Sequence, residues 1–530
     1  MQRFFYFVLV FFIFSCSAEA KTYRICKPTD LEGRTLELKT GSKVVFKKEG
    51  RILNGTVKGN NCKIVVKAKA PVLQNVRLSG SFKNVKAYLS WWVSDEDITD
   101  EVESLVTSFC GTVYLDRTGQ LTKPITLDQK KALTIDGCGN FFGLYNINGF
   151  AFYVKRASKI EVRNASFKYI SSDPGTSSHV GVLRFAHGGA SNVNIHDVLI
   201  EGFDNSRYKP CGVDAIQIEG CKSGTTTTIY NVTVKDMVVK GDGKETNGVG
   251  ANYAISVDCH DMESGKVEIY SCHITNMYNV DDNGNKIYED TSGIYLGGAV
   301  GKDREGEMTY CNWNATIHDC YFNDISKRNI KIQGNHVLMQ NLNSATTESF
   351  LKDYHNMYVG INGDNITIDG IYGQYDGSIV KITGDYLIIR DMDCTSNLRD
   401  SKYASVIRLD GTQNATIEDC KFDNDTYMFI YPTERNMTEA TVPEYHIKRC
   451  SLNVKNLLYC ITNYPIIHKK GILTVEDSDI TLSGTYVSNS KSLAEIRLIG
   501  TRIKGKGRLT TPRDNGGPRL TVNKSEIKEQ

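Results

Sequence analysis

The sequence predicts an all-β fold, a right-handed parallel β-helix solenoid with N-terminal cap rungs and one short capping helix. The first observation is a recurring phrase of a β-branched strand, a polar turn residue and a second apolar segment, as in residues 160–167, 315–322 and 415–422. A second, alternating type of strand lies between the copies, as in residues 214–219 and 293–297. Short strands that recur at such intervals are typical of a solenoid whose rungs stack on one another. The 46 Gly and only 10 Pro residues suit the many tight turns of such a coil.

The first twenty residues have the pattern of an export signal. Met1-Gln-Arg supplies a positive charge, residues 4–14 are apolar, and residues 18–20 form a small-residue cleavage site. We therefore expect residues 1–20 to be a signal peptide and the protein to be periplasmic, extracellular or attached to the outer membrane. A cut before Cys16 is the alternative, and it would leave a lipid anchor on that cysteine. No later segment is long and apolar enough to be a transmembrane helix.

The remaining chain divides near residue 92. Residues 21–92 hold short strands with tight turns and are predicted to form an N-terminal β cap region, and residues 93–530 are predicted to form the parallel β-helix. A helix over residues 94–109, capped by Ser94, is expected to cover the open end of this coil. Long polar loops cluster between residues 204 and 313, so the largest polar cleft is expected over rungs 200–340. The faces of residues 22–90 and 470–530 should be smoother.

The overall charge excludes one class of partner. The chain has 63 Lys and Arg against 61 Asp and Glu, a formal net charge of +2, so no whole-molecule field draws it to nucleic acid. Attraction to a charged partner must be local.

The repeat also predicts the interior. Four of the 15 cysteines follow the turn residue of the recurring phrase, where small apolar side chains would stack inside the coil as free thiols. Cys211 and Cys221 flank one strand and could pair if their loops converge. The residues expected in one apolar column are Ile160, Ile195, Ile269, Ile317, Ile368 and Ile417, and the four stacked cysteines are Cys272, Cys320, Cys420 and Cys450.

The strand and turn pattern, with Gly111-Thr-Val-Tyr-Leu after the expected helix and Thr134-Ile-Asp-Gly, resembles the pectate-lyase superfamily of right-handed β-helices over most of residues 93–530. This resemblance implies the fold, and it implies polysaccharide lyases or glycoside hydrolases as the enzyme classes. Four segments are in phase with the catalytic motifs of polygalacturonase-like hydrolases, but here they read Gly212-Val-Asp, Asn252-Tyr, Ser292-Gly and Lys331-Ile-Gln. Asp214 is the catalytic residue type that survives, so the catalytic motifs of that family are not retained.

The outward side chains of the alternating strands form two predicted columns. If Ile216 and Ile218 point inward, Gln217 and Glu219 point outward, and the same phase can be followed through the later rungs. The first column is Gln217, Ser256, Tyr295, Lys331, Gly360, Lys381, Arg408 and Tyr431, and the second is Glu219, Asp258, Gly297, Gln333, Asn362, Thr383 and Asp410.

These columns suggest an acidic polysaccharide as the partner. The basic side chains would match the repeating carboxylates of a uronate polymer, and tyrosine rings would stack on sugars. Solvation of a sheet surface is the plainer reading of the same lysines. The residues predicted to bind substrate are Gln217, Glu219, Lys381 and Arg408.

The preferred chemistry is β-elimination from a uronate. This reaction needs a cation for the carboxylate, a base for the C5 proton and an acid for the leaving oxygen, and the candidates are Lys331, Arg328, Tyr295 and His260. An inverting hydrolase that uses Asp214 and Asp258 is the enzymatic alternative.

Two further readings concern a metal and a role without catalysis. The loop with Asp281 and Asp282 is similar to a cation-binding loop and could hold calcium, or it is a solvated turn. A β-helix that binds glycan or a cell surface through the same face without catalysis is the third functional hypothesis.

Overall fold

The computed structural model describes residues 19–67, 70–93, 95–128, 131–186, 190–241, 250–287, 289–302, 308–345, 357–375, 377–395, 405–433, 442–458, 469–484, 487–488, 493–506, 509–510 and 517–529. The chain forms two compact units, Met1–Ser94 with Asp100–Val113, and Asp95–Thr99 with Tyr114–Gln530. Most of the predicted signal peptide, and with it Cys16, lies outside the described residues.

The first unit consists of short parallel strands. β5 pairs in parallel with β2, β3, β4 and β6, and β1 pairs in parallel with β4. The helix α1 begins at Thr99, because the Asp97 carboxylate accepts the Thr99 backbone N–H at 3.0 Å. It therefore starts five residues after Ser94, which lies outside the described residues. The elements are β1 (Thr22–Ile25), β2 (Pro28–Asp30), β3 (Thr35–Glu37), β4 (Lys43–Phe46), β5 (Arg51–Val65), β6 (Leu73–Phe82), β7 (Lys86–Tyr88), a 3-10 turn (Leu89–Trp91), α1 (Thr99–Ser108) and β8 (Gly111–Tyr114).

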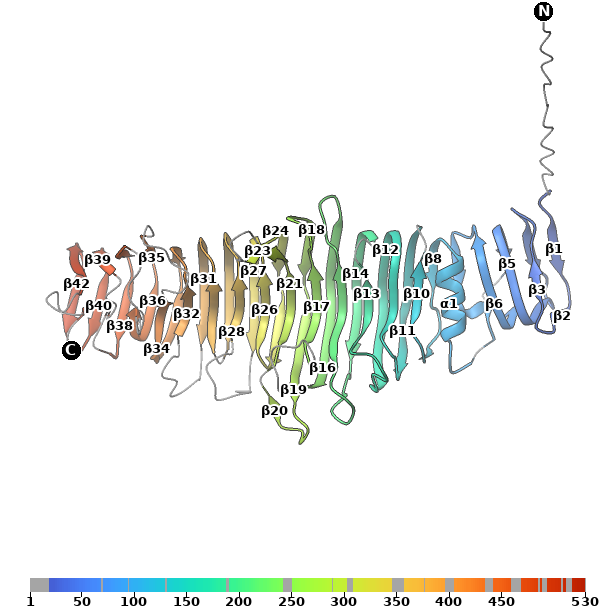
Figure 1. The fold of residues 1–530 in the computed structure, drawn as a ribbon, viewed down its shortest axis with the longest axis horizontal. Helices are drawn as coiled ribbons and strands as arrows, with labels where there is room; N and C mark the ends of the chain where they lie inside the picture. The colour runs from blue at the N-terminus through green and yellow to red at the C-terminus, as the bar shows by residue number, and fades with distance from the viewer. Residues whose placement is uncertain are drawn as a thin grey trace, which may run out of the picture. The chain divides into compact units, whose positions relative to one another are not determined.

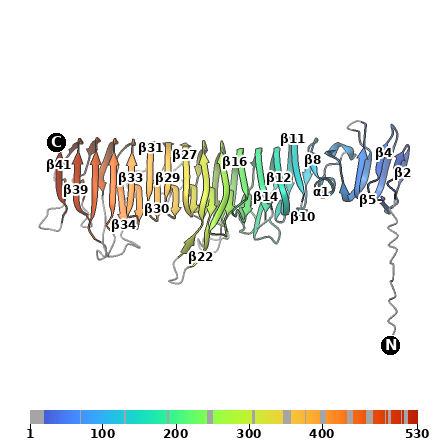
Figure 2. The ribbon, with the colours of Figure 1, turned by 90° about the horizontal axis from the view of Figure 1, so that it is seen from above.

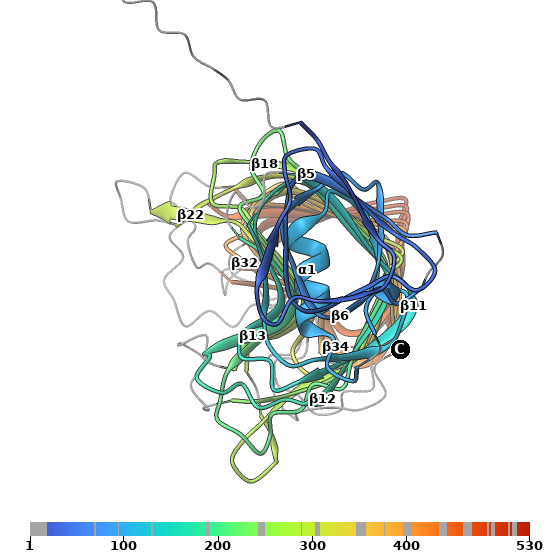
Figure 3. The same cartoon turned by 90° about the vertical axis from the view of Figure 1, so that its right-hand side faces the viewer.

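The second unit is a parallel β-helix, and the predicted fold class is confirmed. Its strands follow one another as rungs, from cyan to red in Figure 1, and Figure 3 looks along the coil. Strands pair in parallel with the equivalent strand of the next rung, which gives three ladders. The rungs begin with β9 (Gly119–Leu121), β10 (Ile125–Asp128), β11 (Ala132–Tyr145) and β12 (Phe150–Ser171).

The first ladder carries the alternating strands and continues from β12. Its later strands are β13 (His179–Phe185), β15 (Gly212–Glu219), β17 (Asn252–Asp258), β21 (Thr291–Gly297), β26 (Arg328–Gln333), β28 (Met357–Asn362), β30 (Ser378–Thr383), β32 (Ser405–Asp410) and the end of β34 (Lys421–Thr433).

The second ladder carries the recurring phrase. It continues from β11 and β12 through β14 (Ala190–Glu201), β16 (Thr226–Lys240), β18 (Glu263–Tyr270), β24 (Asn312–His318), β27 (Asn335–Ala345), β29 (Ile366–Gln374), β31 (Leu387–Thr395), β33 (Asn414–Glu418), β35 (Glu444–Lys448), β37 (Gly471–Glu476), β39 (Leu493–Ile499) and β41 (Arg519–Asn523).

The third ladder follows the corner after the second. It comprises the ends of β11, β12, β14, β16, β27, β29 and β31, the start of β34, and β19 (His273–Val280), β25 (Tyr321–Ile325), β36 (Ser451–Leu458), β38 (Asp479–Leu482), β40 (Arg502–Gly505) and β42 (Glu526–Glu529). Two short antiparallel additions leave the coil, β20 (Lys286–Ile287) beside β19 and the hairpin of β22 (Ala299–Lys302) and β23 (Met308–Tyr310), and Figure 2 shows β22 projecting from the rungs.

The polar residue in the recurring phrase forms the corner between the second and third ladders. Asn164, Asp197, Asn231, Asp319 and Asp419 there have φ between 51° and 58°, the left-handed conformation that Asn and Asp adopt more readily than most other residues. The next residue points inward, and Cys272, Cys320, Cys420 and Cys450 are all buried, as predicted. Cys211 and Cys221 are buried free thiols.

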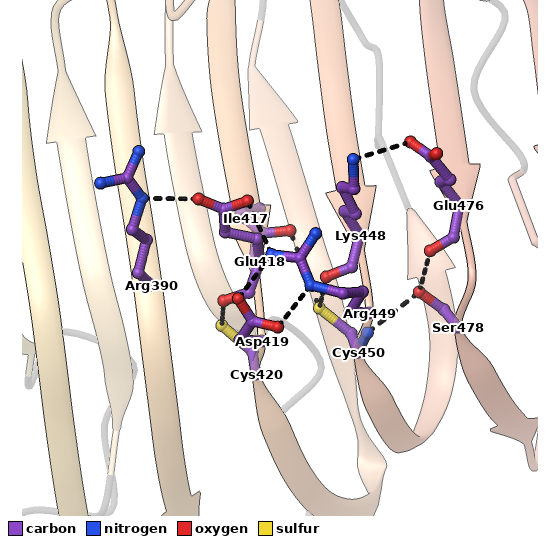
Figure 4. A network of polar contacts seen from close by, with 10 residues as sticks. All are labelled: Arg390, Ile417, Glu418, Asp419, Cys420, Lys448, Arg449, Cys450, Glu476 and Ser478. Atoms are coloured by element: carbon purple, nitrogen blue, oxygen red, sulfur yellow. Dashed lines mark hydrogen bonds and ion pairs between the residues drawn. The ribbon is translucent and has the colours of Figure 1, made fainter.

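Ion pairs between outward side chains connect neighbouring rungs at the corner between the second and third ladders. In the network of Figure 4, Arg449 Nε donates to Asp419 Oδ1 at 2.6 Å, and the Glu418 carboxylate accepts from both Arg390 and Arg449. The backbone N–H of Cys450 donates to Ser478 Oγ at 3.0 Å.

The predicted apolar column is present with one correction. Ile195, Ile269, Ile317, Ile368 and Ile417 lie in one buried column, in which Ile229, Met339 and Ile389 occupy the intervening rungs. Ile160 is also buried, but it pairs with Val193 and belongs to the neighbouring inward column, two residues earlier in the strand. Among the described residues, no helix has the length and apolar character needed to cross a membrane.

Candidate functional site

The first ladder places the predicted outward residues in register. Gln217 pairs with Ser256, Ser256 with Tyr295, and Tyr295 with Lys331. The same column continues through Gly360, Lys381, Arg408 and Tyr431. The second column starts with Glu219 opposite Asp258 and continues through Gly297 and Gln333 to Asp410. We call the outward side chains of β13 to β26 the site face.

Lys331 is anchored by a residue from a loop. Asp290 immediately precedes β21, and its Oδ2 accepts a hydrogen bond from Lys331 Nζ at 2.6 Å while its Oδ1 accepts one from Arg328 Nη1 at 2.5 Å. The Tyr253 hydroxyl also donates to Asp290 Oδ2, at 2.6 Å. Lys331 Nζ lies 4.7 Å from the centre of the Tyr295 ring, close enough for a cation–π interaction. We call Tyr253, Asp290, Tyr295, Arg328 and Lys331 the cation group.

Burial changes the protonation of this group. Burial by itself opposes ionisation of Asp290, but Lys331 and Arg328 outweigh it and hold the pKa of that carboxyl well below its ordinary value. Burial lowers the pKa of Lys331, although Asp290 partly compensates. Burial raises the pKa of Tyr295, and the nearby Asp258 adds to this, so the phenol stays protonated at neutral pH. Two cations and one carboxylate leave one formal positive charge in the cation group.

Lys331 is therefore not the exposed sheet lysine that alternation alone suggests. Its side chain points outward, but only 16% of its surface is exposed, because Asp290 and the tyrosine rings cover it. Replacing Lys331 is therefore expected to lower the stability of the fold.

Asp258 has a pKa suited to proton transfer near neutrality. Burial, followed by the charges of Asp214 and Glu219, raises its pKa to about 7. A methyl group added to Gly297 would lie 2.1 Å from Asp258 Oδ1 and 2.8 Å from the Tyr295 hydroxyl oxygen. The missing side chain of Gly297 thus lets the carboxyl and the phenol approach the same point. The Tyr295 hydroxyl donates to Gln333 Oε1 at 2.6 Å.

The other two acids of the site face are held by basic partners. Asp214 is buried and pairs with His179 Nε2. Burial disfavours protonation of His179, but the bond to Asp214 outweighs this and raises the pKa of the imidazole. Glu219 Oε1 accepts a hydrogen bond from Arg184 Nη2 at 2.7 Å. Asp214 is therefore poorly placed as the water-activating base of an inverting hydrolase.

Several buried polar atoms of the site face have no hydrogen-bond partner among the described residues. Polar groups buried in this way are uncommon in proteins and often mark positions where water or a ligand binds. They are Arg184 Nε, Asp214 Oδ1, Gln217 Oε1, Ser256 Oγ and Ser292 Oγ.

Two of the predicted binding residues are paired with an acid instead of forming a free basic run. Lys381 Nζ lies 3.6 Å and Arg408 Nε 3.0 Å from the carboxylate of Asp410, which is almost fully buried. Burial lowers the pKa of Lys381. Asp410, two residues after Arg408 in β32, therefore neutralises much of the positive charge of Lys381 and Arg408.

The remaining predicted residues lie outside this arrangement. His260 is exposed in the loop after β17. Asp281 Oδ1 accepts the backbone N–H groups of Asn283 and Asn285, both at 2.8 Å, and the exposed Asp282 pairs with Lys240. This loop is a hydrogen-bonded turn, and no group of three or more His, Cys, Asp or Glu side chains suited to a metal occurs within the described parts of the chain. The calcium prediction thus finds no supporting geometry.

A hollow lies at some distance along the coil from the expected cleft. It has a volume of about 460 Å³ and lies on the third ladder, over β31, β34, β36, β38 and β40. Asp479 and Arg502 belong to its lining, so the outer face after residue 470 is not smooth.

Sequence reasoning missed Asp290, His179 and Arg184. Arg184 pairs with Gln217 one rung earlier, so extending the outward phase backward would have found it. His179 lies at the start of the same strand. Asp290 carries no periodic signal, because it belongs to a loop.

No family model and no curated protein matches this chain. Among solved structures, the A-module of the mannuronan C-5 epimerase AlgE6 from Azotobacter vinelandii matches with 12% identity and a TM-score of 0.33, over 84% of this chain and 100% of that chain. A likeness of this size carries no argument about the site.

Proposed function

We propose that the chain is an exported carbohydrate-active β-helix protein that acts on an acidic, uronate-containing polysaccharide by β-elimination. The observation that carries this proposal is the approach of Asp258, whose pKa is about 7, to the hydroxyl of Tyr295, beside the cations Lys331 and Arg328. Acid and base groups with pKa values near the working pH are the most effective proton-transfer catalysts.

Each role follows from the protonation of the group. The net positive charge of the cation group would neutralise the uronate carboxylate and so acidify its C5 proton. Ionised Asp258 would remove that proton, and protonated Tyr295 would give a proton to the departing glycosidic oxygen. Turnover should therefore rise as the pH passes through 7, the pKa of Asp258.

An ultraviolet assay tests the proposal, because elimination leaves an absorbing double bond in the product. The full chain is incubated with polygalacturonate, polymannuronate and polyguluronate, with a neutral glucan as the control polymer. We expect absorbance with at least one uronate, and a loss of about 100-fold or more in Asp258→Asn and in Tyr295→Phe. Lys421→Ala, on the third ladder, is the matched control that should keep full activity.

The other outcomes distinguish the alternatives. New reducing ends without absorbance would indicate a hydrolase. If the protein binds a uronate polymer but forms no product, the binding hypothesis is favoured. The ion pairs of Asp214, Glu219 and Asp290 agree with that hypothesis, because these acids already have basic partners. Full turnover by both Asp258→Asn and Tyr295→Phe would overturn the assigned roles.

A further inference from the structure

Three buried cysteines gather at the end of the first ladder, next to the site face. Cys221 follows β15, Cys259 follows β17, and Cys311 precedes β24. The backbone N–H of Cys259 donates to the Gly297 carbonyl and that of Cys311 to the Gly298 carbonyl, both at 2.7 Å. Two adjacent glycines therefore fix the backbones of Cys259 and Cys311.

Cys259 and Cys311 are in direct contact through their sulfur atoms. The Cys311 thiol donates to Cys259 Sγ at a sulfur–sulfur distance of 3.0 Å, and both residues are fully buried. This is only about 1 Å longer than a disulfide bond. The two residues are 52 positions apart in the sequence, so a bond between them would close a long loop.

The stacked cysteines at the corners combine backbone contacts with contacts to one another. Cys272, Cys320, Cys420 and Cys450 each donate to the carbonyl oxygen two residues earlier, at 3.2 to 3.4 Å. The side chains of Cys272 and Cys320, and those of Cys420 and Cys450, also interact with each other. The contact that brings two sulfur atoms to 3.0 Å is the one between Cys311 and Cys259. The hydrogen bond from Cys311 also lowers the pKa of Cys259, which favours the nucleophilic thiolate form.

We propose that Cys259 and Cys311 are a disulfide-forming pair. The Cys259 thiolate attacks one sulfur of an external small-molecule disulfide, whose S–S bond breaks and releases the first small thiol. The Cys311 thiolate then attacks Cys259 Sγ in the mixed disulfide and releases the second small thiol. The two cysteines lose two electrons, the external disulfide gains them, and the two cysteine protons end on the released thiols.

The bond would act next to the proposed chemistry. Cys259 directly follows Asp258, and Cys311 directly follows the hairpin of β22 and β23. The cross-link would therefore fix the end of β17 and the base of this hairpin against the Gly297-Gly298 segment.

Peptide mapping tests the pair without any assay of activity, so its result is independent of the proposed function. The reduced, unfolded full chain is refolded with reduced and oxidised glutathione, alkylated, and digested with trypsin without reduction. We expect a cross-link between the peptides of residues 245–266 and 305–327, with fragment ions that assign it to Cys259 and Cys311. Cys320→Ser, in the second of these peptides, should keep the link, and Cys311→Ser should abolish it.

Alkylated Cys259 and Cys311 in the refolded protein, or a link from Cys259 to Cys320, would overturn the proposal. A thermal melt provides the second measurement. The refolded wild type should melt several degrees lower after reductant is added, because the closed loop restricts the unfolded chain. The double variant Cys259→Ser, Cys311→Ser should melt at the same temperature with and without reductant, and a response equal to that of the wild type would also contradict the pair.

Discussion

The site face and the hollow on the third ladder are two polar surfaces of the same coil, built by the same alternation. In the hollow, Asp393, Lys421, Asp479 and Arg502 occupy one outward column, and each side chain is more than half exposed. Their ion pairs are loose, 3.5 Å for Lys421 with Asp393 and 3.4 Å for Arg502 with Asp479. On the site face, Lys331 and Arg328 lie 2.6 and 2.5 Å from Asp290 and are largely covered.

A loop residue and two aromatic rings account for the difference. Asp290 returns over the site face from the segment before β21, and Tyr253 and Tyr295 pack beside it with ring centres 4.8 Å apart. These groups remove water from the charges and strengthen their interactions. The charges around the hollow remain in water and keep ordinary solvation. The coil thus forms ordered polar columns on both surfaces. The pKa values of the side chains are shifted where a loop residue and aromatic rings cover the column.

The largest effect is expected from removing the acid that joins the cations. Asp290→Ala leaves Lys331 and Arg328 without their shared partner in a largely buried setting. We expect a loss of about 3–5 kcal/mol in the free energy of unfolding, measured by denaturant titration. Asp393→Ala, which removes the exposed partner of Lys421, should cost less than about 0.5 kcal/mol. Equal costs for the two variants would contradict the difference between the surfaces.

A pH-dependent effect is expected from Asp258. The folded protein holds its proton up to a pH of about 7, while the unfolded chain releases it near the ordinary value of 3.8, so folding takes up a proton between these values. The stability due to this group is therefore present below pH 3.8 and is lost as the pH rises to 7. Asp258→Asn, which imitates the protonated form, should match the wild type at low pH and exceed it by about 2 kcal/mol at pH 8, after allowance for partial exposure.

Thermal melts of both proteins across this range measure the effect. Asp479→Asn, in the hollow, is the control and should follow the wild type at every pH. Parallel pH profiles for Asp258→Asn and the wild type would show that Asp258 does not hold its proton in the folded state.

A smaller effect is expected from filling the space under Asp258. In Gly297→Ala, the new methyl group would meet Asp258 Oδ1 and the Tyr295 hydroxyl. The Asp258 side chain can rotate away, so the expected cost is about 1 kcal/mol in unfolding free energy, at the low end for overpacking. Turnover should fall much more than stability. Gly301→Ala is the matched control, because no atom of the described residues lies within 4 Å of the added methyl group. Equal turnover in the two variants would contradict the assigned approach of Asp258 and Tyr295 beside Gly297.

The sequence predicted the columns better than it predicted their chemistry. Strand alternation and the repeat place Gln217, Tyr295 and Lys331 in one outward column, and the register confirms this, because a slip by one residue would expose the apolar side chains between them. Loop paths have no such constraint, so neither Asp290 over Lys331 nor the closed turn of Asp281 could be derived. Burial of Lys331 could not be predicted either, because it depends on that loop.

The smallest effect is expected in the hollow itself. Lys421 is 70% exposed, and its ion pair with Asp393 is long, so Lys421→Ala should change the unfolding free energy by less than about 0.5 kcal/mol. If the substrate lies on the site face, this variant should also keep the turnover and the uronate affinity of the wild type. Binding assays at two salt concentrations measure the affinity, since a contact between an exposed lysine and a carboxylate weakens with salt. A marked loss of affinity in Lys421→Ala would place the polysaccharide in the hollow, and exposed charges would then matter more than covered ones.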